Sequence, residues 1–323
     1  MKILLFILLF GGFFSAQEIR EYYTSYQDFD FQKQPKKITK IHYLFKDKVA
    51  IEQRKETYVF DDIGNITTIT EVNFMDGNNE MKTVYEYQNG LLTKECSSFT
   101  DKNSIQHCTM YEYNKEMQLT KKTLQGEEDY MEMTTYSYAN NRLQKINIDL
   151  AGDIQFLKEL FYNSKGELYL IKSTETSSNG KKNFATEAYS KGKLLFHRDH
   201  DGSNTFIYHK EPKLELQFLV KGKKTLAYLE LLEDGLTEKN QIVESDLGLF
   251  IFDNIKNEKE IKTYNITVFK RNENQDVIAS GSRENVLKPL QRIDFQKIEY
   301  ADGTTSGSED FNIFIYNELN TMK

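Results

Sequence analysis

A short block of residues recurs along the chain at intervals of 24 to 27 residues. Each block has an aromatic residue, then a tight polar turn, and then an aliphatic residue. The leading aromatic residues are Phe60, Tyr87, Tyr113, Tyr138, Tyr162 and Tyr189. Repetition at this length indicates that the chain stacks copies of one supersecondary unit. We therefore expect a repetitive architecture over residues 41–209.

The turn in each block has the residues that β-hairpins need. The two-residue turns are Asn89-Gly90, Asn140-Asn141 and Lys191-Gly192. A type I′ turn needs positive φ at both central positions, which Asn and Gly adopt readily and Lys less so. Gly64 and Gly166 suit the left-handed position that ends a three-residue loop, and Met117 takes this position in the third block. We therefore predict a hairpin at every block.

The stretches between the blocks predict that all six aromatic residues share one face of a sheet. The aliphatic residues expected to face them are Ile66, Leu92, Leu119, Leu143, Leu168 and Leu194. From each of these to the next aromatic residue the separations are 21, 21, 19, 19 and 21 residues. Side chains alternate between the faces of a strand, so odd separations with even-length distal loops keep the aromatic residues on one face. We predict an all-β fold, an antiparallel meander with two strands per repeat that forms a large curled sheet.

The blocks resemble the YD (Rhs-type) repeat family, whose pattern is Tyr-x-Tyr-Asp/Asn-x-x-Gly-x-Leu. The stretch from Tyr58 to Ile66 matches this pattern nearly throughout, and the stretch from Tyr162 to Leu168 matches its second half. Two further stretches match its first half, Tyr85-Glu86-Tyr87 and Tyr111-Glu112-Tyr113. The resemblance covers about residues 41–209, and the repeats are degenerate. It implies a wide β-sheet with a generic binding or scaffolding role.

Residues 1–16 have the features of a secretory signal peptide. Lys2 supplies a positive charge, residues 3–14 are nearly all apolar, and Ser15-Ala16 provide small residues before the expected cleavage site. An apolar run of about 12 residues is shorter than the ~20 that cross a bilayer. We therefore expect a mature chain without a transmembrane span, exported to the periplasm, the outer surface or the medium.

The mature chain divides into two regions by its pattern. Residues 17–209 form the predicted repeat domain, and residues 210–323 are β-rich without a regular repeat. Glu211-Pro212 is the best boundary between them, because proline is disfavoured in a central strand. The second region is either a separate β domain or a run of degenerate repeats that continues the sheet.

Alternating apolar residues predict further strands in the C-terminal region. Residues 214–220 alternate up to a polar turn at residues 221–224, and Leu226 and Tyr228 follow at the same spacing, which predicts a hairpin. The leucine-rich window 226–236 also fits a short helix. Phe250 and Phe252 repeat the alternation, as do residues 264–268. The chain closes with Phe295 to Tyr300, a turn at residues 301–303, and Phe311, Ile313 and Ile315.

Charge and candidate ligand residues argue against several kinds of chemistry. The 49 acidic and 42 basic residues are spread along the chain, which therefore lacks the basic footprint of a nucleic-acid-binding protein. The densest group of metal-ligand residues is His197, Asp199, His200, Asp201 and His209. This group has no zinc-type spacing, so we interpret it as a polar turn rather than a metal site. No cofactor motif and no catalytic residue stands out.

Cys96 and Cys108 are the only cysteines, and a close pair in an exported protein favours a disulfide. A three-residue loop over residues 101–103 would place the two directly opposite each other. The odd separations oppose this pairing. They need an even-length loop between the two cysteines, and such a loop would point the two side chains to opposite faces of the sheet. A β-bulge in either strand would remove the conflict, since it adds one residue. The sequence is therefore compatible with a disulfide and with two free thiols.

Two classes of function fit these observations. The favoured one is an exported, non-enzymatic β-repeat protein with a binding or scaffolding role at the bacterial cell envelope. Its partner would be another envelope protein or a polysaccharide. The alternative is a carrier or hydrolase whose pocket lies in residues 210–323. The residues with defined places in the fold are the landmarks Phe60, Gly64, Tyr87, Gly90, Tyr113, Tyr138, Tyr162, Gly166, Tyr189 and Gly192.

Overall fold

The computed structural model is almost entirely β, which confirms the predicted fold class. It describes residues 25–29, 31–100, 107–126, 130–199, 203–210, 214–221, 224–233, 237–245, 265–283 and 288–322. These residues form one 21-stranded antiparallel sheet with one 3-10 helix and one α-helix. The predicted signal peptide at residues 1–16 lies outside the described residues, and so do Phe250 and Phe252.

The first thirteen strands contain the six blocks. They are β1 (Pro35–Lys46), β2 (Val49–Phe60), β3 (Ile66–Asn73), β4 (Asn79–Gln88), β5 (Leu91–Phe99), β6 (His107–Tyr113), β7 (Leu119–Gln125), β8 (Met131–Ala139), β9 (Arg142–Leu150), β10 (Ile154–Tyr162), β11 (Leu168–Ser177), β12 (Lys182–Ser190) and β13 (Lys193–Arg198). The 3-10 helix η2 (Tyr26–Phe29) precedes them. Each block therefore forms the hairpin that joins two consecutive strands, as predicted.

The remaining strands continue in the same sheet. They are β14 (Asn204–Lys210), β15 (Leu214–Lys221), β16 (Lys224–Glu233), β17 (Thr237–Ser245), β18 (Asn265–Arg271), β19 (Val277–Arg283), β20 (Arg292–Tyr300) and β21 (Thr305–Gly307), followed by helix α2 (Ile313–Thr321). β13 pairs with β14, and β14 pairs with β15 across the Glu211-Pro212 position. Consecutive strands therefore remain paired with each other, and the sheet continues from the repeat region into the C-terminal region.

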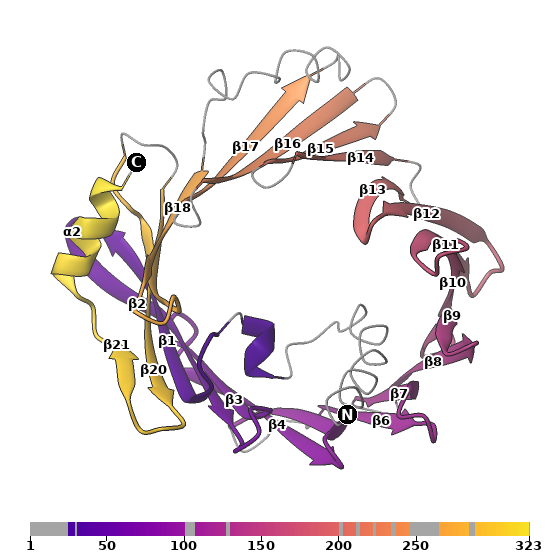
Figure 1. The fold of residues 1–323 in the computed structure, drawn as a ribbon, viewed down its shortest axis with the longest axis horizontal. Coiled ribbons are helices and arrows are strands. Elements are labelled where there is room, and N and C mark those ends of the chain that lie inside the picture. Colours follow the sequence, from indigo (N-terminus) through magenta and orange to yellow (C-terminus); the bar gives the residue numbers. More distant parts are fainter. Residues whose placement is uncertain are drawn as a thin grey trace, which may run out of the picture.

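The first and last long strands of the sheet lie side by side. β1 pairs with β2 along one edge and with β20 along the other, and β20 also pairs with β19 and β21. The pairings therefore lead from β1 along the chain and back to β1, and Figure 1 shows the strands arranged around a ring. We call the side of the sheet on which η2 lies the inner face, and the side on which α2 lies the outer face (Figure 1).

A β-bulge stands at the same place in every block. In the second block Tyr87 faces Leu92 but Glu86 faces Lys94, so Thr93 is the extra residue. Equivalent register shifts occur beside Phe60, Tyr113, Tyr138, Tyr162 and Tyr189. The distal loops are odd in length, as between Leu150 and Ile154, so the expectation of even loops was wrong. The bulge adds one residue to each repeat, and this extra residue keeps the leading aromatic residues on the same face of the sheet.

The turn conformations are those that the residues predicted. Gly64 and Gly166 have φ of 89° and 85°, and Met117 has φ of 60° at the equivalent position. All three two-residue turns have positive φ at both central positions: Asn89, Gly90, Asn140, Asn141, Lys191 and Gly192. Lys191 therefore adopts the left-handed conformation that its side chain disfavours, because the hairpin around it fixes the backbone.

Tyrosine hydroxyl groups connect each repeat to the one before it. The Tyr87 hydroxyl donates a hydrogen bond to the carbonyl oxygen of Ile66, 2.8 Å away. Three tyrosines repeat the contact: Tyr113 with Leu92, Tyr138 with Leu119 and Tyr162 with Leu143, at 2.8, 2.9 and 2.8 Å. These four aromatic residues therefore lie on one face, as the odd separations predicted. The strand register places these four tyrosines on the inner face, whereas Cys96 and Cys108 lie on the outer face.

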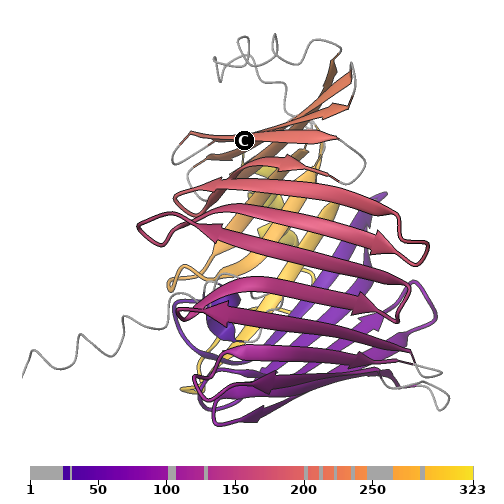
Figure 2. The ribbon, with the colours of Figure 1, turned by 90° about the vertical axis from the view of Figure 1, so that its right-hand side faces the viewer.

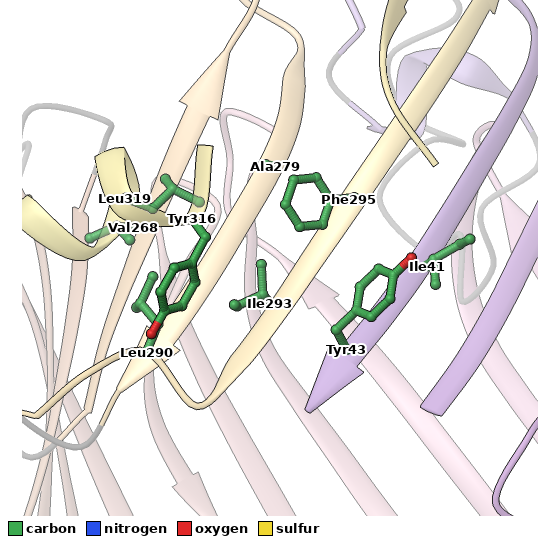
Figure 3. Close-up of a cluster of buried hydrophobic side chains, with 9 residues drawn as sticks. All are labelled: Ile41, Tyr43, Val268, Ala279, Leu290, Ile293, Phe295, Tyr316 and Leu319. Atoms are coloured by element: carbon green, nitrogen blue, oxygen red, sulfur yellow. The ribbon is translucent and has the colours of Figure 1, made fainter. Parts of the chain in front are cut away.

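Buried side chains concentrate where β1 and β20 meet. One cluster lies on the outer face beneath α2 and contains Ile41, Tyr43, Val268, Ala279, Leu290, Ile293, Phe295, Tyr316 and Leu319 (Figure 3). A second cluster contains Ile38, Phe60, Ile66, Ile298 and Tyr300, with Tyr26 and Phe31 packed against it from the inner face. We call β1, β2, β19, β20, α2 and residues 25–29 and 31–34 the terminal junction. It has a covering layer on both faces of its sheet.

Two C-terminal elements differ from the expectations. The window 226–236 does not form a helix: β16 is hydrogen-bonded to both β15 and β17. Conversely, Ile313 and Ile315 do not continue a strand but belong to α2. Asn312 caps this helix, because its side-chain oxygen accepts hydrogen bonds from the backbone N–H groups of residues 314 and 315.

The C-terminal region contains one more turn of the repeat type. Asn272 accepts a hydrogen bond from the backbone N–H of Asp276, as Asn163 does from Glu167 in the fifth block. Gln275 has φ of 68°, and a register shift follows beside Arg271. The alternation of apolar residues predicted a polar turn at residues 271–274, but not that it is of the repeat type, because Arg271 occupies the position of the leading aromatic residue.

Candidate functional site

A shallow groove with a volume of about 380 Å³ crosses strands β8 to β12. It is lined by Met133, Thr135, Asn147, Ile148, Asp149, Gln155, Phe156, Leu157, Thr174, Thr176 and Lys182. Residues that face each other in adjacent strands share a face, and the register followed from Ile41, beneath α2, leads to this groove. The groove therefore lies on the outer face, opposite to the ladder of tyrosines.

Strand register arranges the lining residues in two rows across the strands. In one row Thr135 faces Asn147, Asn147 faces Leu157 and Leu157 faces Thr174. The other row contains Met133, Asp149, Gln155, Thr176 and Lys182. Alternation along each strand explains the composition: the intervening residues, such as Ile146 and Leu160, are buried on the inner face.

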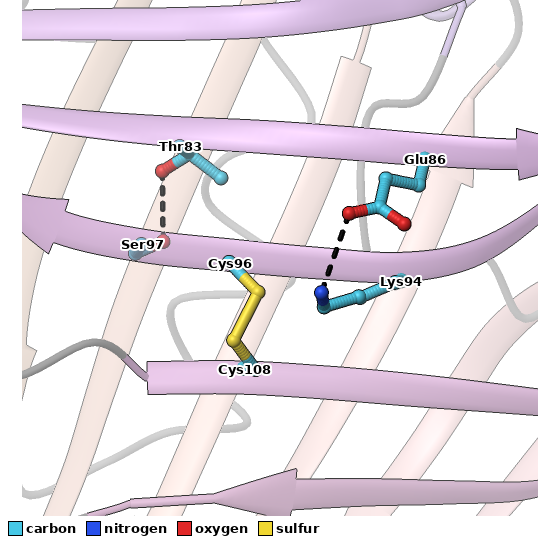
Figure 4. Close-up of a disulfide and its surroundings, with 6 residues drawn as sticks. All are labelled: Thr83, Glu86, Lys94, Cys96, Ser97 and Cys108. Atoms are coloured by element: carbon cyan, nitrogen blue, oxygen red, sulfur yellow. Dashed lines mark hydrogen bonds and ion pairs between the residues drawn. A yellow bond between two sulfur atoms is a disulfide. The ribbon is translucent and has the colours of Figure 1, made fainter.

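The uncharged polar side chains of the groove have no partners within the described part of the chain. These are the hydroxyl and amide groups of Thr135, Asn147, Gln155, Thr174 and Thr176. Elsewhere in the sheet comparable groups are paired, as where the Thr83 and Ser97 hydroxyls lie 2.8 Å apart (Figure 4). Asp149 accepts a hydrogen bond from the backbone of Gly152. The groove thus presents a set of uncharged donors and acceptors that the fold leaves free.

No described element covers this part of the outer face. Figure 2 shows strands β8 to β12 toward the viewer with nothing in front of them. Phe184 in β12 faces Thr174 at the rim of the groove, and 62% of its surface is exposed. Asp149 and Lys182 are the only charged residues in the lining. The groove is therefore open, polar and close to neutral.

A second polar cluster lies on the inner face of the terminal junction. His42 in β1 contacts Asp294 of β20 through Nδ1, with 2.7 Å between Nδ1 and Oδ1. Its Nε2 lies 3.3 Å from Oε1 of Glu56 in β2, close enough for an ion pair but without hydrogen-bond geometry. Arg54 and Tyr58 also contact Glu56, at 2.6 and 2.8 Å. One histidine thus joins the last long strand to the first two.

The charged forms of this cluster are stabilised. Burial opposes the charge on His42, but the carboxylates of Asp294 and Glu56 outweigh it and raise the pKa of the imidazole. Burial likewise works against the ionised Glu56, but His42, Tyr58 and Arg54 lower the pKa of its carboxyl to about 2. The pKa of Asp294 is also lowered, against its burial, by His42 and Lys40. His42, Glu56 and Asp294 thus form an ion network in which each charged form is stabilised by its neighbours.

The residues singled out in the sequence lie away from the groove. All ten landmarks belong to the hairpins, and none of them lines the groove. Cys96 and Cys108 face each other on the outer face and are joined by a disulfide, with Cα atoms 4.1 Å apart (Figure 4). The bulge at Thr93 supplies the extra residue that removes the conflict with the odd separations.

The suggested metal-ligand residues are not assembled in the described structure. His197 lies 3.7 Å from Glu187, and residues 200–202 are outside the described residues. The described residues contain no group of three or more potential ligands placed to hold a metal ion. Among them there is also no helix with the length and apolarity to cross a membrane.

Sequence reasoning missed the groove because its residues carry no motif. The available signal was an alternation in which threonine, asparagine and glutamine occupy the outward positions of consecutive strands, as in Thr174-Glu175-Thr176. Such residues are ordinary on a solvated sheet. Only the register between strands shows that they form two continuous rows.

Comparison with known proteins gives weak structural similarities. No protein-family model and no curated protein matches the sequence. A crystal structure of TcdB2-TccC3 without its hypervariable C-terminal region is similar, with a TM-score of 0.39 and 11% identity over 78% of this chain and 15% of that one. A porin-like protein from Bacteroides uniformis has a TM-score of 0.33 and 13% identity over 82% of this chain and 96% of its own. These scores are too low to carry an argument about function.

Proposed function

We propose that this chain is an exported, non-enzymatic β-repeat protein that binds a partner at the bacterial cell envelope through its outer groove. One observation carries the proposal: five hydroxyl and amide side chains in an uncovered groove have no partners in the described structure. A binding site needs such convergent polar groups, with apolar contacts between them. Met133 and Leu157 supply the apolar contacts.

A binding role is favoured over catalysis by the chemistry of the two polar clusters. The groove contains one carboxylate, Asp149, and no histidine or cysteine. The His42 cluster has the titratable groups, but the pKa values of its two carboxyls, Glu56 and Asp294, are lowered, whereas a carboxyl that acts as a general acid or base needs a pKa near the working pH. The alternative of a carrier or hydrolase places a pocket in residues 210–323, while the groove lies in β8 to β12.

Sedimentation with isolated cell envelopes tests the binding role. The purified protein is expected to sediment with envelopes of the source bacterium, and the Thr135→Ala/Asn147→Ala variant to stay mostly in the supernatant. Ser137→Ala is a matched control, because Ser137 lies on the same strand and face as Thr135 but outside the groove. Equal sedimentation of all three proteins, or of none, would contradict the proposal.

Cell fractionation tests the export on which this role depends. The expressed full-length chain is expected in the periplasm, on the outer surface or in the medium, with residues 1–16 removed. Intact mass measurement of the recovered protein reports the cleavage. A full-length chain recovered only from the cytoplasm would overturn the proposed location.

A further inference from the structure

We infer that the ligand of the outer groove is a neutral oligosaccharide that lies across strands β8 to β12. This inference rests on the proposed binding function and names its ligand class. The lining has one acidic and one basic residue, Asp149 and Lys182, so it provides no net charge to attract an ionic ligand. Asp149 is in addition engaged by the backbone of Gly152. The complementary ligand is therefore polar and uncharged.

The hydrogen-bonding groups of the groove match sugar hydroxyls. A threonine hydroxyl both donates and accepts, and the amides of Asn147 and Gln155 each offer an oxygen and an N–H₂ group. A sugar hydroxyl also donates and accepts. Each hydroxyl can therefore pair with any of these side chains, whichever way round the ligand lies in the groove. A ligand with many hydroxyls uses the whole row, whereas a ligand with one polar end would leave most of the row unpaired.

An extended peptide fits this groove less well than a sugar. Peptides that bind to sheets add a strand at a free edge, where unpaired backbone groups supply the hydrogen bonds. Strands β9, β10 and β11 are each paired on both sides, so their backbone groups are already used. Only side chains remain to hold the ligand, and they are arranged across the strands.

The dimensions and the apolar surface of the groove fit several linked sugars. Neighbouring strands lie about 4.8 Å apart, so five strands extend across about 19 Å. Leu157 lies between Asn147 and Thr174 in its row and offers a flat apolar contact. Phe184, 62% exposed at the rim, provides an aromatic face on which the C–H side of a sugar ring can stack.

Calorimetric titration with a panel of short oligosaccharides tests the inference. The neutral members are fragments of cellulose, chitin, mannan and xylan, and the charged member is an oligogalacturonate. At least one neutral member is expected to bind. Because each variant removes one hydrogen-bonding group, Asn147→Ala and Thr174→Ala should each weaken it roughly fivefold. Phe184→Ala should also weaken binding, and Ser137→Ala should leave it unchanged.

The outcomes separate this inference from the proposed function. If no oligosaccharide binds while envelopes still sediment the protein through the groove, the ligand class is wrong and the binding function stands. If neither occurs, both are wrong. Tighter binding of the oligogalacturonate than of every neutral member would overturn the neutral class. Oligosaccharide binding that the groove variants do not weaken would overturn the site. Melting curves of each variant establish that it is folded.

Discussion

The terminal junction and the repeat strands β5 to β13 are built from similar hairpins but are stabilised differently. In the junction, Phe295 packs beneath α2 on the outer face, and Ile298 belongs to the cluster that Tyr26 and Phe31 cover on the inner face. Both side chains have no exposed surface. In β8 to β12 no described element covers the outer face. The repeat strands are stabilised by an inner-face cluster, by the tyrosine-to-carbonyl bonds and, between β5 and β6, by one disulfide.

This difference separates stability from binding. A covering layer buries apolar area and stabilises the sheet, but it also occupies the face on which a ligand would lie. No described element lies on that face of β8 to β12, and the bulges and tyrosine contacts keep the strands in register. The groove therefore lies on a face that packs against no described element.

The largest expected effect concerns two phenylalanines with opposite surroundings. Phe295→Ala removes a fully buried ring from the junction and should lower the free energy of unfolding by about 3–5 kcal/mol. Phe184→Ala removes a ring that is 62% exposed and should change it by less than about 0.5 kcal/mol. Urea unfolding followed by circular dichroism measures both. Comparable losses would mean that the two regions are stabilised alike.

The disulfide is the strongest single support of the repeat strands. Cys96 and Cys108 are 12 residues apart, and closing a loop of this size adds roughly 2–3 kcal/mol to stability. The Cys96→Ser/Cys108→Ser variant should lose about this amount, and reduction should have the same effect on the wild type. Alkylation under non-reducing conditions, followed by mass spectrometry, checks the bond itself. Two labelled thiols in the exported protein would contradict it.

The histidine network makes the junction sensitive to pH. Because the pKa of His42 is raised above 6.5, its contribution is fully present below 6.5 and is lost as the pH rises through the folded-state pKa. Because the pKa of Glu56 is lowered from 4.5 to about 2, its contribution is present above 4.5 and lost as the pH falls toward 2. The network should stabilise the junction most between these limits.

His42→Gln tests this dependence. It should cost about 1.5–3 kcal/mol of unfolding free energy near pH 6, since hydrogen bonds to charged groups are lost. The difference between wild type and variant should shrink as the pH rises through the folded-state pKa of His42, because the wild-type imidazole then loses its proton. Lys40, Arg54, Tyr58 and Glu71 also lie around the site, so Tyr58→Phe serves as a control that keeps the histidine. A difference that does not vary with pH would contradict the network.

The smallest expected effect compares two glycines in three-residue turns. Gly166 and Gly180 both have positive φ, so valine strains the backbone at both positions. A Cβ at Gly166 would also meet the guanidinium of Arg142, which lies over the Tyr162 ring, whereas the space around Gly180 is open. Gly166→Val should therefore be the more destabilising by about 0.5–1 kcal/mol. Equal melting temperatures would show that the Arg142 contact contributes nothing.

The repeat strands were predictable because their rules are local. An aromatic residue, a left-handed turn residue such as Gly64, and an aliphatic residue define each hairpin within seven positions. The bulge was not predictable from the odd or even spacing of the aromatic residues alone. An odd distal loop with a bulge and an even distal loop without one both place these residues on the same face of the sheet. The fixed position of Thr93 beside Leu92 became evident only from the register.

The terminal junction and the groove depend on contacts that are distant in the sequence. His42 meets Asp294 across 252 positions, and no local pattern marks either residue. Asn147 and Thr174 become neighbours only because β9, β10 and β11 pair in one register. Helix α2 was missed because Ile313 and Ile315 also fit a strand, and the capping role of Asn312 decided between the two.

Amide hydrogen exchange measured by mass spectrometry tests most directly whether the two regions differ in stability. Amides of β1 and β20 should exchange only through global unfolding, because both faces of the junction are covered. Amides of β8 to β12 should exchange faster, through partial openings of a sheet whose outer face is covered by no described element. Equal protection of the two regions, or stronger protection of β8 to β12 in the free protein, would contradict this view of the molecule.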